Sequence, residues 1–70
     1  MPIAIAPIGR EMKIVRILVD EKTKKHLFNL GITIDAKITV LSAQNGGIIC
    51  LVKDGRLALD RDVSTKILVA

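Results

Sequence analysis

Two side chains of this 70-residue chain could act as nucleophiles or as transition-metal ligands, because His26 is its sole histidine and Cys50 its sole cysteine. Nucleophilic or acid–base catalysis needs a second reactive group beside the first. Cys50 lies in the middle of the most apolar stretch, where a thiol behaves as a small hydrophobic side chain. His26 follows two lysines and is expected at the surface. No reactive cluster can be assembled from these residues, so the sequence does not predict an enzyme.

A metal site built on His26 and Cys50 would need carboxylates to complete it. Asp54, Asp60 and Asp62 are available, but Asp54 belongs to a predicted turn, and no ligand spacing of the zinc-finger or EF-hand type occurs. His26 and Cys50 therefore stay weak metal candidates. A small carrier or sensor of a transition metal such as Fe(II) is kept as an alternative function. No cofactor is firmly implied, because the glycines have neither phosphate-loop nor dinucleotide-loop spacing.

The net charge of +4 raises the question of an acidic partner such as nucleic acid. The two halves of the chain each carry +2, so no basic arm stands out. Single-stranded nucleic acid is usually bound by aromatic side chains on which bases stack, and this chain has one Phe and no Tyr or Trp. Nucleic acid is therefore not the expected partner, although a nucleic-acid-binding barrel is kept as a second alternative.

The elements that would position these residues are mainly strands, because 11 Ile and 6 Val favour pleated surfaces over helices. A short extended segment is predicted over 3–6, between two prolines. A longer strand is predicted over 11–19, curled so that both of its faces meet other parts of the protein. Three further strands are predicted at the segments 37–43, 48–52 and 56–59, and a last one at 66–69, after a turn or helical loop at 60–65.

One helix is predicted before the central strands. Asp20 is a plausible N-cap, and Gly31 suits the left-handed residue that ends a helix. Within it, Thr23, Leu27 and Leu30 fall on one stripe, while Phe28 lies well off that stripe.

Two reversals connect the strands that follow the helix. Asn45-Gly46-Gly47 and Asp54-Gly55 are hairpin signals. Five to six short strands with tight turns and one short helix predict a mostly β fold, a small SH3-like antiparallel barrel. The length fits a single domain over residues 1–70.

The remaining functional hypothesis is a surface that binds a partner protein. So many aliphatic side chains on so small a body leave apolar surface exposed, and such patches mark partner sites. Phe28 is the natural centre of a patch, and Lys24, Lys25 and Leu27 border it. The alternative is that Phe28 folds over the end of the barrel or the following turn.

The expected cellular compartment is inferred from features that are missing from the sequence. A single cysteine fits a reducing environment, and no basic-then-apolar leader occurs at the start. The longest apolar run, residues 48–52, is far short of the ~20 residues that span a bilayer. We expect a cytoplasmic protein without membrane insertion.

The segment Leu27-Phe28-Asn29-Leu30-Gly31-Ile32 closes a predicted lysine-rich helix. Around it in the sequence stand Pro7-Ile8-Gly9, Lys13-Ile14-Val15-Arg16-Ile17, Ala36-Lys37-Ile38-Thr39-Val40-Leu41, Leu57-Ala58-Leu59 and Ile67-Leu68-Val69. Together, and in this order, these pieces resemble the FeoA family of ferrous iron transport accessory proteins. The resemblance spans essentially the whole chain. Asp35 stands where the family usually has glycine, and Asp tolerates left-handed backbone better than most residues.

The resemblance implies an SH3-like barrel that acts in the cytosol beside FeoB, the membrane transporter for ferrous iron. That transporter carries a cytosolic GTP-binding domain, and our hypothesis is that this protein docks on the transporter's cytosolic face and supports or modulates uptake. Phe28, with Lys24 and Lys25 steering the encounter, is the expected centre of the contact.

Overall fold

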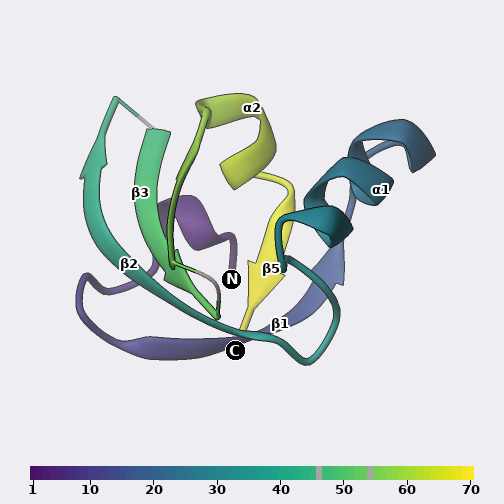
Figure 1. The fold of residues 1–70 in the computed structure, drawn as a ribbon. Coiled ribbons are helices and arrows are strands. Elements are labelled where there is room, and N and C mark those ends of the chain that lie inside the picture. Colours follow the sequence, from purple (N-terminus) through teal and green to yellow (C-terminus); the bar gives the residue numbers. More distant parts are fainter. Residues whose placement is uncertain (46, 54) are drawn as a thin grey trace.

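A computed structural model describes residues 1–45, 47–53 and 55–70, and it contains one five-stranded antiparallel sheet with strand order β4-β3-β2-β1-β5 (Figure 1). The strands are β1 (Glu11–Ile17), β2 (Lys37–Gln44), β3 (Gly47–Val52), β4 (Gly55–Leu59) and β5 (Ile67–Val69). The helices are the 3₁₀ turn η1 (Ile3–Ile5), α1 (Glu21–Asn29) and α2 (Arg61–Ser64). The predicted mostly β fold of the SH3-like small-barrel type is confirmed.

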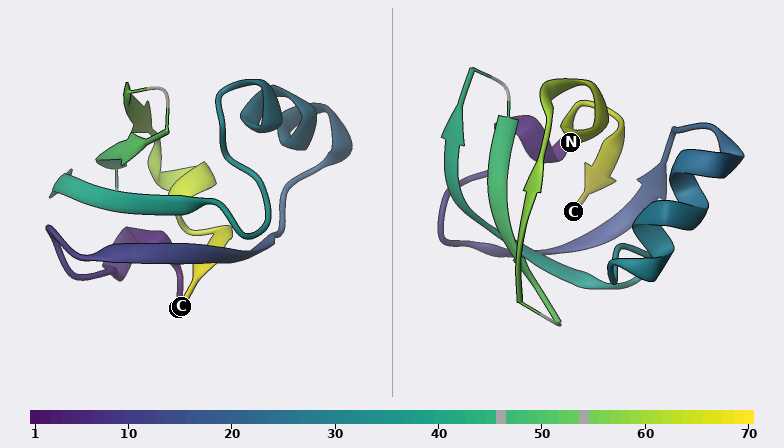
Figure 2. Two further views of the ribbon diagram at one scale, coloured as in Figure 1. Left: turned by 60° about the horizontal axis from the view of Figure 1, so that its bottom comes forward. Right: turned by 45° about the horizontal axis from the view of Figure 1, so that its top comes forward.

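The sheet curls around one apolar core, which alternation along the strands creates. Ile38 and Val40 of β2 are buried, and so is every second residue of β3. The chain start helps to close the barrel, because Met1 and Val69 exchange backbone hydrogen bonds of 2.9 and 2.7 Å. Both termini accordingly lie close together (Figure 2).

Helix α1 begins and ends where its capping residues predict. The Asp20 carboxylate accepts a hydrogen bond of 3.0 Å from the Thr23 backbone N–H, which satisfies a free donor of the first turn. Gly31 has φ 95°, the left-handed conformation that glycine adopts without steric cost. Asp35, in the following loop, also has a positive φ, of 71°.

Both predicted hairpins are confirmed by strand pairing. Gln44 pairs with Gly47 across the first hairpin, and Val52 pairs with Gly55 across the second. Of the predicted turn residues, Gly46 and Asp54 lie outside the described residues. The predicted helical loop is the short helix α2, whose N-cap Asp60 accepts a 2.8 Å hydrogen bond from the Val63 N–H.

The prediction for the beginning of the chain was wrong. Residues 3–5 form a 3₁₀ turn rather than an extended segment, with hydrogen bonds from Ile5 N–H to the Pro2 carbonyl and from Ala6 N–H to the Ile3 carbonyl. The reason is geometric: the turn directs Ile3 fully into the core, and the flanking prolines hold the extended residues on either side.

The prediction for the first long strand was partly wrong. It ends at Ile17 rather than at Val19, because its partner β5 is only three residues long. Its faces also differ, since Met12 and Ile14 are buried while Lys13 and Val15 are exposed. A register irregularity between Ile14 and Arg16 bends the strand between its two neighbours, β2 and β5, and this bend replaces the predicted burial of both faces.

Candidate functional site

Phe28 is the most prominent exposed apolar side chain of α1. It is 65% exposed, whereas its neighbour Leu27 is 3% exposed and belongs to the core. Two adjacent helix positions point about 100° apart, so burial of Leu27 forces Phe28 outward. The alternative in which Phe28 folds over the barrel is not what the structure shows. Leu27 is placed in the core, which does not agree with the expectation that it borders the contact surface.

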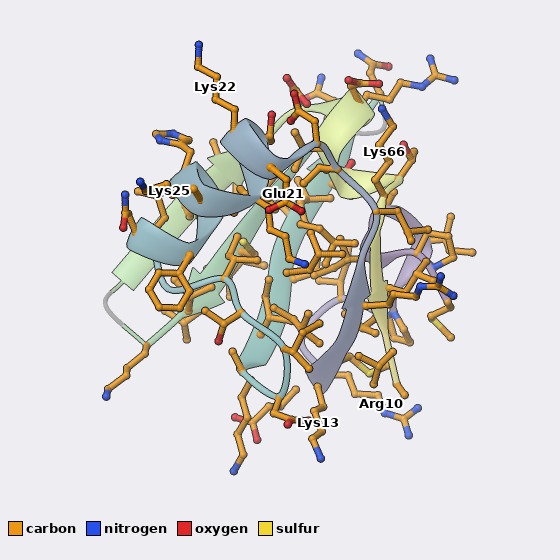
Figure 3. The ribbon with its side chains drawn as sticks, turned by 90° about the vertical axis from the view of Figure 1, so that its right-hand side faces the viewer. Arg10, Lys13, Glu21, Lys22, Lys25 and Lys66 are labelled. Carbon is orange, nitrogen blue, oxygen red and sulfur yellow. The ribbon has the colours of Figure 1, made fainter. Side chains whose placement is uncertain are left out.

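Lysines surround Phe28 on the helix. Lys24 and Lys25 precede it by four and three residues and therefore lie on the same side of α1. An open depression of about 490 Å³ lies over this part of the helix, lined by Phe28 with Glu21, Lys22, Lys24 and Lys25. Lys22 and Lys25 extend outward from α1 in Figure 3. We call Phe28, Lys24 and Lys25 the α1 docking surface.

The lysines of the α1 docking surface are available to an acidic partner. No ion pair within residues 1–45, 47–53 and 55–70 involves either of them. The hydrogen bond from Thr23 holds the pKa of the nearby Asp20 carboxyl below its usual value, so this cap stays ionised at neutral pH. This capping hydrogen bond therefore stabilises the first turn of α1, directly before Lys24 and Lys25.

The two metal candidates lie in different environments. Cys50 is fully buried on β3, and its Sγ donates to the Leu57 carbonyl at 3.4 Å. Burial raises the pKa of this thiol to about 11, so the thiolate that metals prefer is disfavoured. His26 is exposed on α1. In the described part of the chain, no three His, Cys, Asp or Glu side chains gather into a possible metal site.

A groove on the outer side of the sheet is a feature that the sequence did not reveal. It has a volume of about 540 Å³ and lies between the α1–β2 loop and strands β2 and β3, lined by Glu11, Gly31, Thr33, Ala36, Lys37, Thr39, Leu51, Val52 and Lys53. The sequence signal nearest to it is the run at residues 48–52, which is apolar at every position although only every second residue faces the core; this run indicates two apolar faces of β3 and not the groove itself. We call this feature the sheet groove.

The described helices include none with the length and apolar character that a membrane span requires. Helix α1, the longest of them, has nine residues and carries several charges.

The whole chain, residues 1–70, matches a family model described as FeoA domain. A curated protein of Methanocaldococcus jannaschii, named "Putative Fe(2+) transport protein A", is 32% identical over 68 residues, which cover 97% of this chain and 83% of that protein.

Solved structures share the fold. A crystal structure described as iron uptake regulatory protein (FeoA) superposes with a TM-score of 0.88 at 27% identity, over 99% of this chain and 93% of that chain. A FeoA protein from Chlorobium tepidum gives 0.86 at 21% identity, over 99% and 68% of the two chains. A manganese-dependent transcriptional repressor gives 0.89 at 19% identity, and the match covers 99% of this chain but 39% of the repressor. At those last two identities the likeness shows the fold alone.

Proposed function

The chain belongs to the FeoA domain family, and from this premise we propose that it is a cytoplasmic accessory protein of ferrous iron transport that modulates the transporter FeoB by docking on its cytosolic GTP-binding domain. The iron connection comes from the name of the Methanocaldococcus jannaschii relative and from the solved FeoA protein. The transporter as partner comes from what the family resemblance implies.

The observation that supports the proposed contact is the outward position of Phe28 on α1. This helix is capped at its start by Asp20 and packs against the barrel through Leu27. An aromatic ring that is 65% exposed is costly to leave in water and is the residue type enriched at the centres of protein interfaces. Lys24 and Lys25 beside it add positive charge, which attracts an acidic partner surface over long range and speeds the encounter. The α1 docking surface therefore combines an apolar anchor with electrostatic steering.

The proposed role is regulatory rather than catalytic. In the proposal this chain performs no chemical step of its own; the described residues place the sole histidine on the surface and the sole cysteine in the core. In the proposal, Fe(II) is the cargo of the transporter, and this chain acts on the transporter through protein–protein contact.

Uptake in cells tests this function. Cells lacking the gene are complemented with the wild-type protein, with Phe28→Ala, or with Ile5→Ala as a matched control, because Ile5 is a similarly exposed apolar residue on η1. We expect Ile5→Ala to restore the wild-type rate of labelled Fe(II) uptake and Phe28→Ala to leave the rate of the deleted strain. Wild-type uptake with Phe28→Ala would contradict the proposed surface.

A further inference from the structure

The sheet groove shares no lining residue with the depression around Phe28 and has no role in the proposed function. Its floor is the outer face of the sheet, where Leu51 is 45% exposed and pairs across the ladder with Thr39 of β2. Its wall is the loop that follows α1, contributed by Gly31, Thr33 and Ala36. The groove volume of about 540 Å³ exceeds that of a leucine side chain.

Apolar surface continues out of the sheet groove along β3. Ile49, two residues from Leu51 and on the same face, is 39% exposed, and Ala58 of β4 pairs with it. Leu41 lies beside the register irregularity of β2, opposite this part of β3, and is 36% exposed. A strand that is apolar on both faces is typical of a strand covered on both faces. Among the described residues of β3, those on the inner face are buried, whereas Ile49 and Leu51 on the outer face are exposed.

The charges at one end of the groove define what could cover it. Lys53 lines the groove, and Arg56 is the cross-strand partner of Leu51. Neither makes an ion pair with any described residue. Glu11 is the one described acid lining the groove, and its charge is offset by Lys37 at 3.8 Å. Among the described residues at this end, the charge left for a ligand is therefore positive.

We propose that the sheet groove binds an extended segment of a partner protein that carries apolar side chains at two alternate positions and an acidic side chain at the next alternate position, so that all three face the sheet. The apolar side chains lie against Ile49 and Leu51, and the carboxylate lies against Lys53 and Arg56. Side chains at alternate positions of an extended chain are about 7 Å apart, the spacing at which Leu51 and Ile49 stand on β3. Since none of these residues belongs to the α1 docking surface, this contact adds to the proposed function and does not depend on it.

A second copy of this chain is a poorer occupant. Each copy carries +4, and a symmetric contact over this face would bring Arg56 and Lys53 of both copies together. An acidic partner gains from the same charges.

Two blocked synthetic peptides test the proposal on the full chain: one with leucine, leucine and glutamate at three successive alternate positions and serine between them, and the same peptide with lysine in place of the glutamate. With ¹⁵N-labelled protein, the glutamate peptide should shift the amide signals of Thr39, Leu51, Val52 and Lys53 at millimolar concentration. The lysine peptide should bind at least about fivefold more weakly, because its charge meets Lys53 and Arg56. Added salt should weaken the binding of the glutamate peptide, because it screens the attraction between opposite charges.

Variants of exposed residues complete the test without threatening the core. Leu51→Ser should abolish the response and Lys53→Glu should reverse the preference between the peptides, while the matched control Ile5→Ser should bind as the wild type does. No shift in the groove at millimolar glutamate peptide, or equal binding of both peptides, would overturn the proposal. Concentration-dependent shifts of the groove signals without peptide, lost in Leu51→Ser, would assign the groove to a second copy and overturn it as well.

Discussion

The backbone N–H of Ile32 donates to the Leu27 carbonyl at 2.9 Å, immediately beyond the last turn of α1. Both side chains are buried, with exposures of 1% and 3%. This bond and the paired burial fasten the end of the helix to the barrel, so Phe28 is presented on a rigid support rather than on a mobile loop. A pre-organised anchor loses less conformational entropy on binding than a mobile one.

Gly31 makes this arrangement possible, and its replacement should destabilise the protein. A Cβ at φ 95° is strained, so Gly31→Ala should lower the free energy of unfolding by roughly 1–2 kcal/mol. Urea denaturation followed by circular dichroism measures this change.

Asn45 offers a control variant for which the free energy of unfolding should not fall. Its φ is 55°, so Asn45→Gly removes a left-handed residue with a side chain and should be neutral or slightly stabilising. Equal destabilisation by Gly31→Ala and Asn45→Gly would contradict the conformational explanation.

The capping carboxylate makes the stability of α1 depend on pH. Hydrogen bonding from Thr23 lowers the pKa of Asp20 in the folded state below its ordinary value of 3.8. The contribution of this group is therefore present above pH 3.8 and is lost as the pH falls through the lower folded-state pKa. In thermal unfolding, Asp20→Asn, which still accepts the hydrogen bond, should lose less stability below about pH 4 than the wild type loses. A wild-type and an Asp20→Asn protein with parallel pH profiles would exclude this cause.

Several of these features were predictable because they are encoded locally. Asp20 and Gly31 act through their own backbone and their nearest neighbours, so the ends of α1 could be located from the sequence. The conformation of residues 3–5 could not be predicted in this way, because their apolar side chains fit a strand and a 3₁₀ turn equally. Packing in the barrel selects the turn. Helical periodicity put Leu27 on one stripe of the helix and Phe28 off it, but it left open whether Phe28 is exposed or folds over the end of the barrel, because that depends on the neighbouring loop and strands.

The sheet groove could not be predicted in the same way. Its wall and floor come from residues far apart in the sequence, such as Thr33 and Leu51, and their approach depends on the curl of the whole sheet. The apolar run at 48–52 signalled only that β3 has two apolar faces. The segment that lies beside the outer face of β3 is decided by the tertiary fold and not by the local sequence.

Cys50 should be chemically inert in the folded protein. Its thiol is fully buried with a pKa of about 11, so a thiol reagent at about pH 8 should label it only at the rate of opening or unfolding. Labelling in native buffer should be slow, and labelling in denaturant should be complete within minutes. Rapid native labelling would show that the thiol is accessible and would reopen its role as a ligand.

The same thiol should also limit stability at alkaline pH. The ordinary pKa of a cysteine thiol is 9.0, whereas the pKa of Cys50 in the folded chain is about 11. Above pH 9.0 the unfolded state therefore ionises first, and stability falls as the pH rises toward 11. Cys50→Ala should cost about 1 kcal/mol at neutral pH through lost packing and should remove this part of the alkaline decline. Identical alkaline profiles of the two proteins would exclude ionisation of Cys50 as the cause.

Docking through α1 is tested most directly by titrating the ¹⁵N-labelled protein, and its Phe28→Ala and Ile5→Ala variants, with the cytosolic GTP-binding domain of FeoB. We expect the amide signals of residues 22–32 to shift in the wild type and in Ile5→Ala. In Phe28→Ala we expect the Kd to rise by about tenfold or more, as for an aromatic anchor at the centre of an interface. Unchanged spectra at high domain concentration, or a Phe28→Ala variant that binds as tightly as the wild type, would contradict docking through α1.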